Sequence, residues 1–124
     1  MNKFLKRLDF TRRYRYREAL LGRGHQWFVR AADITFALYD KYHNDICDTY
    51  KHAQKKCFDK LYDIVSLLPH YHDDADDLDQ LRRLVNGISY CYKKYEEIID
   101  IIDKSMQEEL KIKKLKSDAN ETNP

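Results

Sequence analysis

Apolar side chains recur at steps of three and four residues between about Gln26 and Leu68, and this spacing predicts one face of an α-helix. The positions are Phe28, Ala31, Ile34, Leu38, Tyr42, Ile46, Tyr50, Ala53, Cys57, Leu61, Ile64 and Leu68. Pro69 disfavours the α conformation at the residue before it, so we expect the first long helix to end at Leu68.

A second long helix is predicted to begin near Asp76 or Asp77, because Asp77 and Gln80 have the spacing of a capping box. Its apolar positions are Leu78, Leu81, Val85, Ile88, Tyr92, Tyr95, Ile99, Ile102 and Met106, with a second line at Leu84, Cys91, Ile98 and Ile101. Two adjacent lines make an apolar stripe wider than the seam of a two-stranded coiled coil. More than one helix must therefore cover it.

Two arrangements would cover these stripes. An antiparallel helical hairpin could pair with a second copy, or the first helix could break near the segment 42–45 and one chain could form a bundle of three or four shorter helices. Asn44 and Asp45 are weak helix formers, but neither Gly nor Pro is present there. We favour the unbroken helix with self-association into a homo-oligomer. The predicted interface between copies then comprises Tyr42, Tyr50, Ile88, Tyr92, Tyr95, Ile99 and Ile102.

Composition supports an all-α fold in a single domain. The 124 residues include only three Gly and two Pro, too few for the many turns of a β-sandwich or an α/β unit. Hydrophobic residues make up 43% and charged residues 35%, which is the balance of a globular protein rather than of a disordered one.

Charge is distributed unevenly along the chain. The stretch from Lys3 to Arg30 holds nine Lys and Arg residues against Asp9 and Glu18, whereas the whole chain has a formal net charge of only +2. We predict three parts: a basic aromatic arm over 1–24, a helical hairpin or bundle over 25–115, and a disordered tail over 116–124. The arm should hold a short helix from about Thr11 to Leu21, ended by Gly22 and Gly24.

The basic arm interleaves guanidinium groups with aromatic rings, a composition typical of nucleic-acid binders, since Arg neutralises phosphates and aromatic rings stack on unpaired bases. An extended arm would place arginines on one side and tyrosines on the other, which fits single-stranded RNA or DNA. A helical arm would instead place Arg13 and Arg17 on a face with Leu20 and Leu21. The candidate nucleic-acid-binding residues are Arg12, Arg13, Tyr14, Arg15, Tyr16, Arg17, Arg23, Trp27, Lys113 and Lys114.

The two lysines belong to a second basic cluster, which an antiparallel hairpin would bring beside the arm. In the alternative interpretation, the arginines pair with acidic residues of the bundle or of a neighbouring subunit, or contact an acidic protein or lipid surface.

No motif predicts catalysis, a cofactor or a metal. Cys47, Cys57 and Cys91 are too far apart for CxxC pairs, so we expect reduced thiols. The acidic turn 70–79, which includes His70 and His72, lacks the Gly and terminal Glu of an EF-hand loop and is interpreted as a solvated helix cap. The N-terminal Lys3 and Lys6 interrupt any signal-peptide core, so we expect a cytoplasmic protein with no membrane segment.

The sequence therefore predicts a non-catalytic nucleic-acid-binding or accessory protein that acts in a larger assembly through its basic arm. The alternative function is a protein–protein interaction module, an adaptor or inhibitor, that uses the Tyr-rich helical face without nucleic acid.

Overall fold

The computed structural model describes residues 2–71 and 77–122 of the chain, and it confirms the all-α fold as a small bundle. Three α-helices are present in this part of the chain: α1 (Lys3–Tyr42), α2 (Asp48–Val65) and α3 (Leu78–Thr122). Two short 3-10 helices, η1 (His43–Asp45) and η2 (Leu68–Tyr71), lie in the connections.

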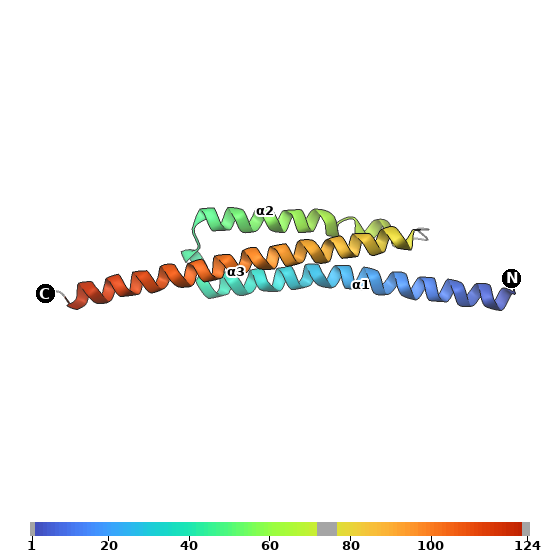
Figure 1. The fold of residues 1–124 in the computed structure, drawn as a ribbon, viewed down its shortest axis with the longest axis horizontal. Helices are drawn as coiled ribbons and strands as arrows, with labels where there is room; N and C mark the ends of the chain where they lie inside the picture. The colour runs from blue at the N-terminus through green and yellow to red at the C-terminus, as the bar shows by residue number, and fades with distance from the viewer. Residues whose placement is uncertain (1, 72–76, 123–124) are drawn as a thin grey trace.

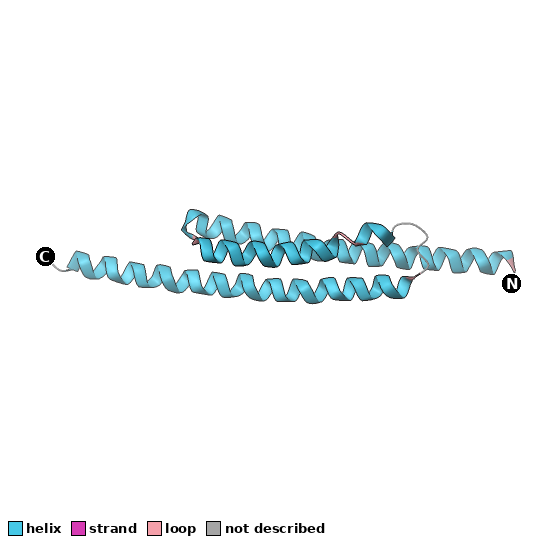
Figure 2. Cartoon of the chain, turned by 90° about the horizontal axis from the view of Figure 1, so that it is seen from above, coloured by secondary structure: helices cyan, strands magenta, loops and turns pink. Residues whose placement is uncertain are grey.

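The helices lie side by side, with α2 antiparallel to the other two (Figures 1 and 2). Helices α1 and α3 run in the same direction, since Trp27 contacts Tyr92 and Tyr42 contacts Asp103 further along both helices. The two helices are also staggered. As a result, the N-terminal part of α1 extends beyond one end of the bundle and the C-terminal part of α3 extends beyond the other (Figure 1).

The first long helix ends at Tyr42, so the favoured prediction of an unbroken helix is wrong and the alternative of a break is correct. His43 has a φ of 50° and a ψ of −127°, a backbone conformation that residues with a Cβ rarely adopt. Its backbone N–H donates to the carbonyl of Tyr39. The buried side chain of Ile46 follows, and α2 begins at Asp48. The chain thus turns without Gly or Pro.

The other helix ends also differ in detail from the sequence prediction. Helix α2 ends at Val65, three residues before the predicted end, and Pro69 lies within η2. The predicted cap at Asp77 is confirmed, because its Oδ1 accepts a hydrogen bond of 2.9 Å from the backbone N–H of Gln80. Residues 72–76 of the predicted acidic turn lie outside the described part of the chain.

Two glycines do not end the N-terminal helix as predicted. Helix α1 continues through Gly22 and Gly24, because glycine inside a helix costs only about 1 kcal/mol relative to alanine and packing can offset that cost. Gly24 is buried, and Leu68 of η2 lies directly against it. The predicted tail differs as well, since α3 remains helical to Thr122.

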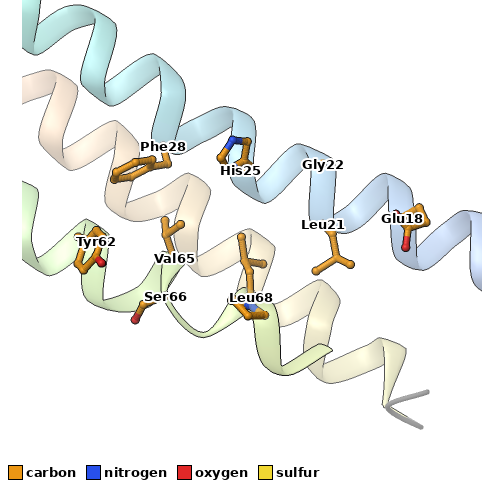
Figure 3. Close-up of a pocket in the computed structure, with 10 residues that line it drawn as sticks. Glu18, Leu21, Gly22, His25, Phe28, Tyr62, Val65, Ser66 and Leu68 are labelled. Carbon is orange, nitrogen blue, oxygen red and sulfur yellow. The ribbon is translucent and has the colours of Figure 1, made fainter. Parts of the chain in front are cut away.

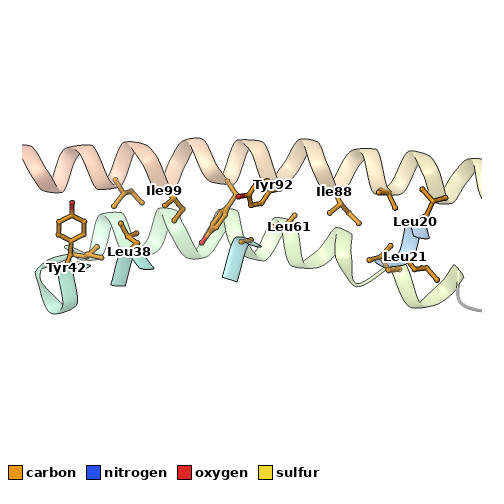
Figure 4. Close-up of a cluster of buried hydrophobic side chains, with 14 of the residues drawn as sticks. Leu20, Leu21, Leu38, Tyr42, Leu61, Ile88, Tyr92 and Ile99 are labelled. Atoms are coloured by element: carbon orange, nitrogen blue, oxygen red, sulfur yellow. The ribbon is translucent and has the colours of Figure 1, made fainter. Parts of the chain in front are cut away.

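The core joins all three helices of the one chain (Figure 4). Every position of the main predicted stripes is buried or partly buried, but Ile101 of the second line is exposed. Of the residues predicted to lie between copies, Tyr50 is partly buried and the others are buried inside this core: Tyr42, Ile88, Tyr92, Tyr95, Ile99 and Ile102. That prediction requires correction, because α2 covers the wide stripe of α3 from within the same chain.

A buried hydrogen-bond network connects the three helices at mid-bundle. Gln54 of α2 is only 8% exposed; its Nε2 donates to the Tyr95 hydroxyl at 2.8 Å, and its Oε1 accepts from the Tyr39 hydroxyl at 2.9 Å. Tyr95 also bonds to the Thr35 hydroxyl, which donates its own proton to the carbonyl of Ala31 at 2.7 Å. Tyr95 must therefore be the donor to Thr35, and every hydroxyl proton in the network is used.

Aromatic rings surround this network. The Phe58 ring meets Tyr95 edge-on, with centroids 5.7 Å apart, and Phe28 lies 5.5 Å from Phe58. Burial raises the pKa of the Tyr95 hydroxyl, which keeps it protonated as a donor.

A second polar cluster fixes the end of α1 to α3. The Tyr42 hydroxyl donates to the Asp103 carboxylate, and Lys41 Nζ lies 3.0 Å from Asp103 Oδ1. The hydrogen bond from Tyr42 lowers the pKa of Asp103, and the hydrogen bond to Asp103 raises the pKa of Lys41. This cluster holds the end of α1 beside the middle of α3.

Separate replacement of the two glycines by alanine tests the approach of η2 to α1. An added Cβ at Gly22 meets nothing within 4 Å, so Gly22→Ala should raise the free energy of unfolding by about 0.5–1 kcal/mol. Gly24→Ala should raise the free energy of unfolding by less than Gly22→Ala does, or should lower it, because the added Cβ would lie 3.0 Å from Leu68 Cδ1. Urea unfolding followed by circular dichroism gives both values. Equal gains would contradict the close packing of Leu68.

Gln54→Met preserves side-chain size but leaves the hydroxyls of Tyr39 and Tyr95 without their amide partner. We expect the free energy of unfolding to fall by about 1–3 kcal/mol. The control is Gln26→Met on the exposed face of α1, which should change it by less than about 0.5 kcal/mol. Thermal and urea unfolding measure both variants, and equal effects would show that the network adds nothing to stability.

Candidate nucleic-acid interface

The N-terminal overhang, defined as Lys3–Tyr16 of α1, carries six basic side chains. Every residue from Asn2 to Tyr16 is exposed. The Asn2 side chain caps the helix by accepting a hydrogen bond of 3.0 Å from the backbone N–H of Phe4. At 1.5 Å per residue, the overhang is about 20 Å long.

The charge of the overhang is strongly positive. Its only acidic residue is Asp9, against six basic ones: Lys3, Lys6, Arg7, Arg12, Arg13 and Arg15. None of these six forms a salt bridge with a residue in the described part of the chain. The first turn carries no acidic residue, so the positive end of the helix dipole adds to the field of the side chains.

The helical conformation changes how the predicted binding residues are arranged. Successive residues on an α-helix are separated by about 100°, so Tyr14 and Tyr16 point in nearly opposite directions. Their side chains are exposed, but they cannot stack on neighbouring bases in the manner predicted for an extended arm. Arg12, Arg13 and Arg15 lie within about 160° of arc, and Lys3, Lys6 and Arg7 occupy the remaining side, so the six basic side chains together surround the helix.

Three of the predicted contacts are placed differently from the rest. Arg17 is only 8% exposed and lies with Leu20 and Leu21 at the start of the bundle, so it cannot offer its guanidinium to a phosphate without moving. Trp27 packs against Tyr92, with ring centroids 4.9 Å apart, and the Arg30 guanidinium lies 5.0 Å from its ring centre. The Trp27 ring is therefore engaged inside the protein. Arg23 is exposed but lies on the bundle, beyond the overhang.

Lys113 and Lys114 lie at the opposite end of the molecule from the basic overhang (Figure 1). The predicted common surface therefore does not form. The sequence prediction assumed one reversal of direction between two long helices. The break at His43 adds a second reversal, so α1 and α3 run parallel and their charged ends separate.

A groove with a volume of about 700 Å³ lies between α1 and the segment from α2 to η2. Leu21 of α1 and Val65 and Leu68 of the facing segment line it (Figure 3). The polar groups on its walls are those of Glu18, His25, Tyr62 and Ser66, and the Ser66 hydroxyl donates to the carbonyl of Asp63. Its lining is suited to an apolar group rather than to a phosphate.

Within residues 2–71 and 77–119, no three His, Cys, Asp or Glu side chains lie close enough together to hold a metal ion. Cys47, Cys57 and Cys91 are free thiols. In the same described part, no helix is both long and apolar enough to span a bilayer.

Comparison with protein-family models, curated proteins and solved structures found no match to this chain. Function therefore has to be inferred from the geometry and charge of the molecule itself.

Sequence reasoning missed the apolar side chains of the overhang. Phe4 is 67% exposed and Phe10 is 61% exposed, and Leu5 and Leu8 are exposed as well. The signal was present in the sequence as an apolar residue at nearly every turn of α1 before Thr11. It was missed because the helix was expected to begin at Thr11 rather than at Lys3.

Arg17 and Arg13, one turn apart on α1, allow a matched test of this placement. Arg17→Gln should lower the free energy of unfolding by more than about 1 kcal/mol, because the long buried side chain loses its packing. Arg13→Gln should change it by less than about 0.5 kcal/mol, because Arg13 is exposed. Urea unfolding compares the two, and an Arg17 variant as stable as the Arg13 variant would contradict the burial of Arg17.

Proposed function

We propose that this protein is a non-catalytic nucleic-acid-binding protein whose N-terminal overhang contacts the phosphate backbone. The observation that supports this function is the excess of five positive charges on one exposed helical segment, without salt-bridge partners in the described part of the chain. Arg13 lines a hollow with Asp77 and Asp79 at the start of α3, but it is exposed like the other five basic residues. Exposed guanidinium and ammonium groups can displace the counterions condensed on a nucleic acid, which is the main source of sequence-independent affinity.

The conformation of the overhang favours a duplex over a single strand. An α-helix with its side chains is about 10–12 Å wide, which matches a major groove of about 12 Å. Arginines on several sides of such a helix can reach phosphates on both walls of the groove. The stacking of Tyr14 and Tyr16 that was expected for single strands would require the overhang to unfold.

A second candidate function is binding of an acidic protein by the same overhang. The exposed side chains of Phe4, Leu5 and Phe10 favour it, because phosphate contacts do not use them and a helix-in-groove complex would bury them. Both candidates share the overhang, so the test must separate charge from apolar contact.

The test measures fluorescence anisotropy of labelled duplex DNA, duplex RNA and single-stranded RNA over a salt series. The overhang variant is Arg12→Gln/Arg13→Gln/Arg15→Gln. Its control, Lys113→Gln/Lys114→Gln/Lys116→Gln, removes the same charge from the other end of the molecule. The overhang variant should reduce the log–log salt slope by about 2–3, since each lost phosphate contact contributes about 0.9, and the control should reduce it by less than about 1.

Several outcomes would contradict the proposal. Absence of binding at low salt would remove nucleic acid as the ligand, and equal effects of the two triple variants would show that only total charge matters. A preference for single strands together with loss of binding in Tyr14→Ala/Tyr16→Ala would restore the extended-arm hypothesis. Phe4→Ser/Phe10→Ser should leave nucleic-acid binding unchanged; a large loss would show that the overhang does not bind through phosphate contacts alone.

A further inference from the structure

Helix α3 carries a line of exposed apolar residues on the side away from the core. Tyr90 is 64% exposed and Ile101 is 61% exposed, and Ile112 and Leu115 continue the line. Tyr90, Ile101 and Ile112 are separated by eleven residues each, which is close to three full turns, so they point in the same direction. We name these four residues the outer line.

Part of this line lies where α3 has no neighbour. The Tyr50 hydroxyl donates to Glu109 at 3.1 Å, and this is the hydrogen bond between α2 and α3 that lies furthest along α3 in the described part of the chain. Beyond it, the C-terminal overhang, defined as Leu110–Thr122, continues alone (Figure 2). An isolated helix of this length is marginal in water, and packing of an apolar face is its usual source of stability.

Charges flank the outer line in an alternating order. Asp100, Lys104, Glu108 and Lys111 form a row along one side of it, and all four are exposed. Their signs are negative, positive, negative, positive. In reverse order the same row has the signs positive, negative, positive, negative. Two copies in antiparallel orientation therefore place opposite charges against each other along the whole row. In a parallel two-fold pair, this row would instead face the opposite flank of the other copy's outer line, so the row would not meet its own complement.

We propose that the outer line is a dimerisation surface occupied by α3 of a second copy in antiparallel orientation. A two-fold axis near Met106 brings Lys104 opposite the second copy's Glu108 and Asp100 opposite its Lys111. The same register places Ile101 beside the second copy's Ile112, and each C-terminal overhang lies along the bundle of the other copy. Such an interface is isologous and closed.

The alternative pairing of two N-terminal overhangs is opposed by charge, because each has an excess of five positive charges. Like charges placed opposite one another disfavour that complex. The row on α3, in contrast, is neutral within each copy and complementary between copies. The proposed dimer does not depend on nucleic-acid binding, and it leaves both N-terminal overhangs free.

The experiment determines mass by sedimentation equilibrium from about 1 to 100 μM, the range that covers moderate affinities. The wild-type chain should associate to a dimer. Ile101→Glu/Ile112→Glu should raise the dissociation constant by at least about tenfold, as expected for loss of central apolar contacts. The control Val29→Glu/Phe36→Glu alters two exposed apolar residues of α1 and should leave the dimer unchanged. Circular dichroism verifies that both variants are folded.

Mixing of two charge variants tests the antiparallel register. Lys104→Glu/Lys111→Glu makes the row entirely acidic, and Asp100→Lys/Glu108→Lys makes it entirely basic. Each variant alone should dimerise at least about tenfold more weakly than the wild type, and the mixture should form a heterodimer. Only contacts between chains can produce this result. A wild-type monomer throughout the series, a dimer that tolerates the Ile variants, or a mixture that stays monomeric would each overturn the proposal.

Discussion

The hydrogen bonds of Gln54 to Tyr39 and Tyr95 fix how the three helices align, and the shape of the molecule depends on that alignment. Leucine and isoleucine stripes can pack in several registers, since each turn offers a similar apolar surface. A buried amide and hydroxyl network is satisfied in only one of them, and a slip of one turn would leave polar groups unpaired in the core. The stagger of α1 against α3 follows from this register.

Much of the fold could be predicted from the sequence, because periodicity reports directly on helices. The main apolar stripes proved to be the core, and Asp77 proved to be a cap. The turn at His43 could not be predicted with the same rules, because residues with a Cβ rarely adopt its positive φ and no glycine marks the position. The passage of α1 through Gly22 and Gly24 depends on contact with Leu68, which is distant in sequence.

The candidate site was predictable in charge but not in geometry. Composition located the basic segment at the N-terminus, whereas the roles of Arg17 and Trp27 depended on which face of α1 met α3. The separation of Lys113 from the arm depended on the relative direction of α1 and α3. One additional reversal of the chain decides that direction, and local sequence carries only a weak signal for it.

The stagger of the two long helices has a consequence for local stability. The middle of α1 can unfold only with the core, whereas the hydrogen bonds before Tyr16 can open without disturbing a single buried contact. Amide hydrogen exchange should therefore be slow near Leu38 and progressively faster toward Lys3. A ligand that orders these turns loses part of its binding free energy to the entropic cost of ordering them. Substitutions that raise the helix propensity of the overhang would lower this cost, so they would raise the affinity even at positions that do not touch the ligand.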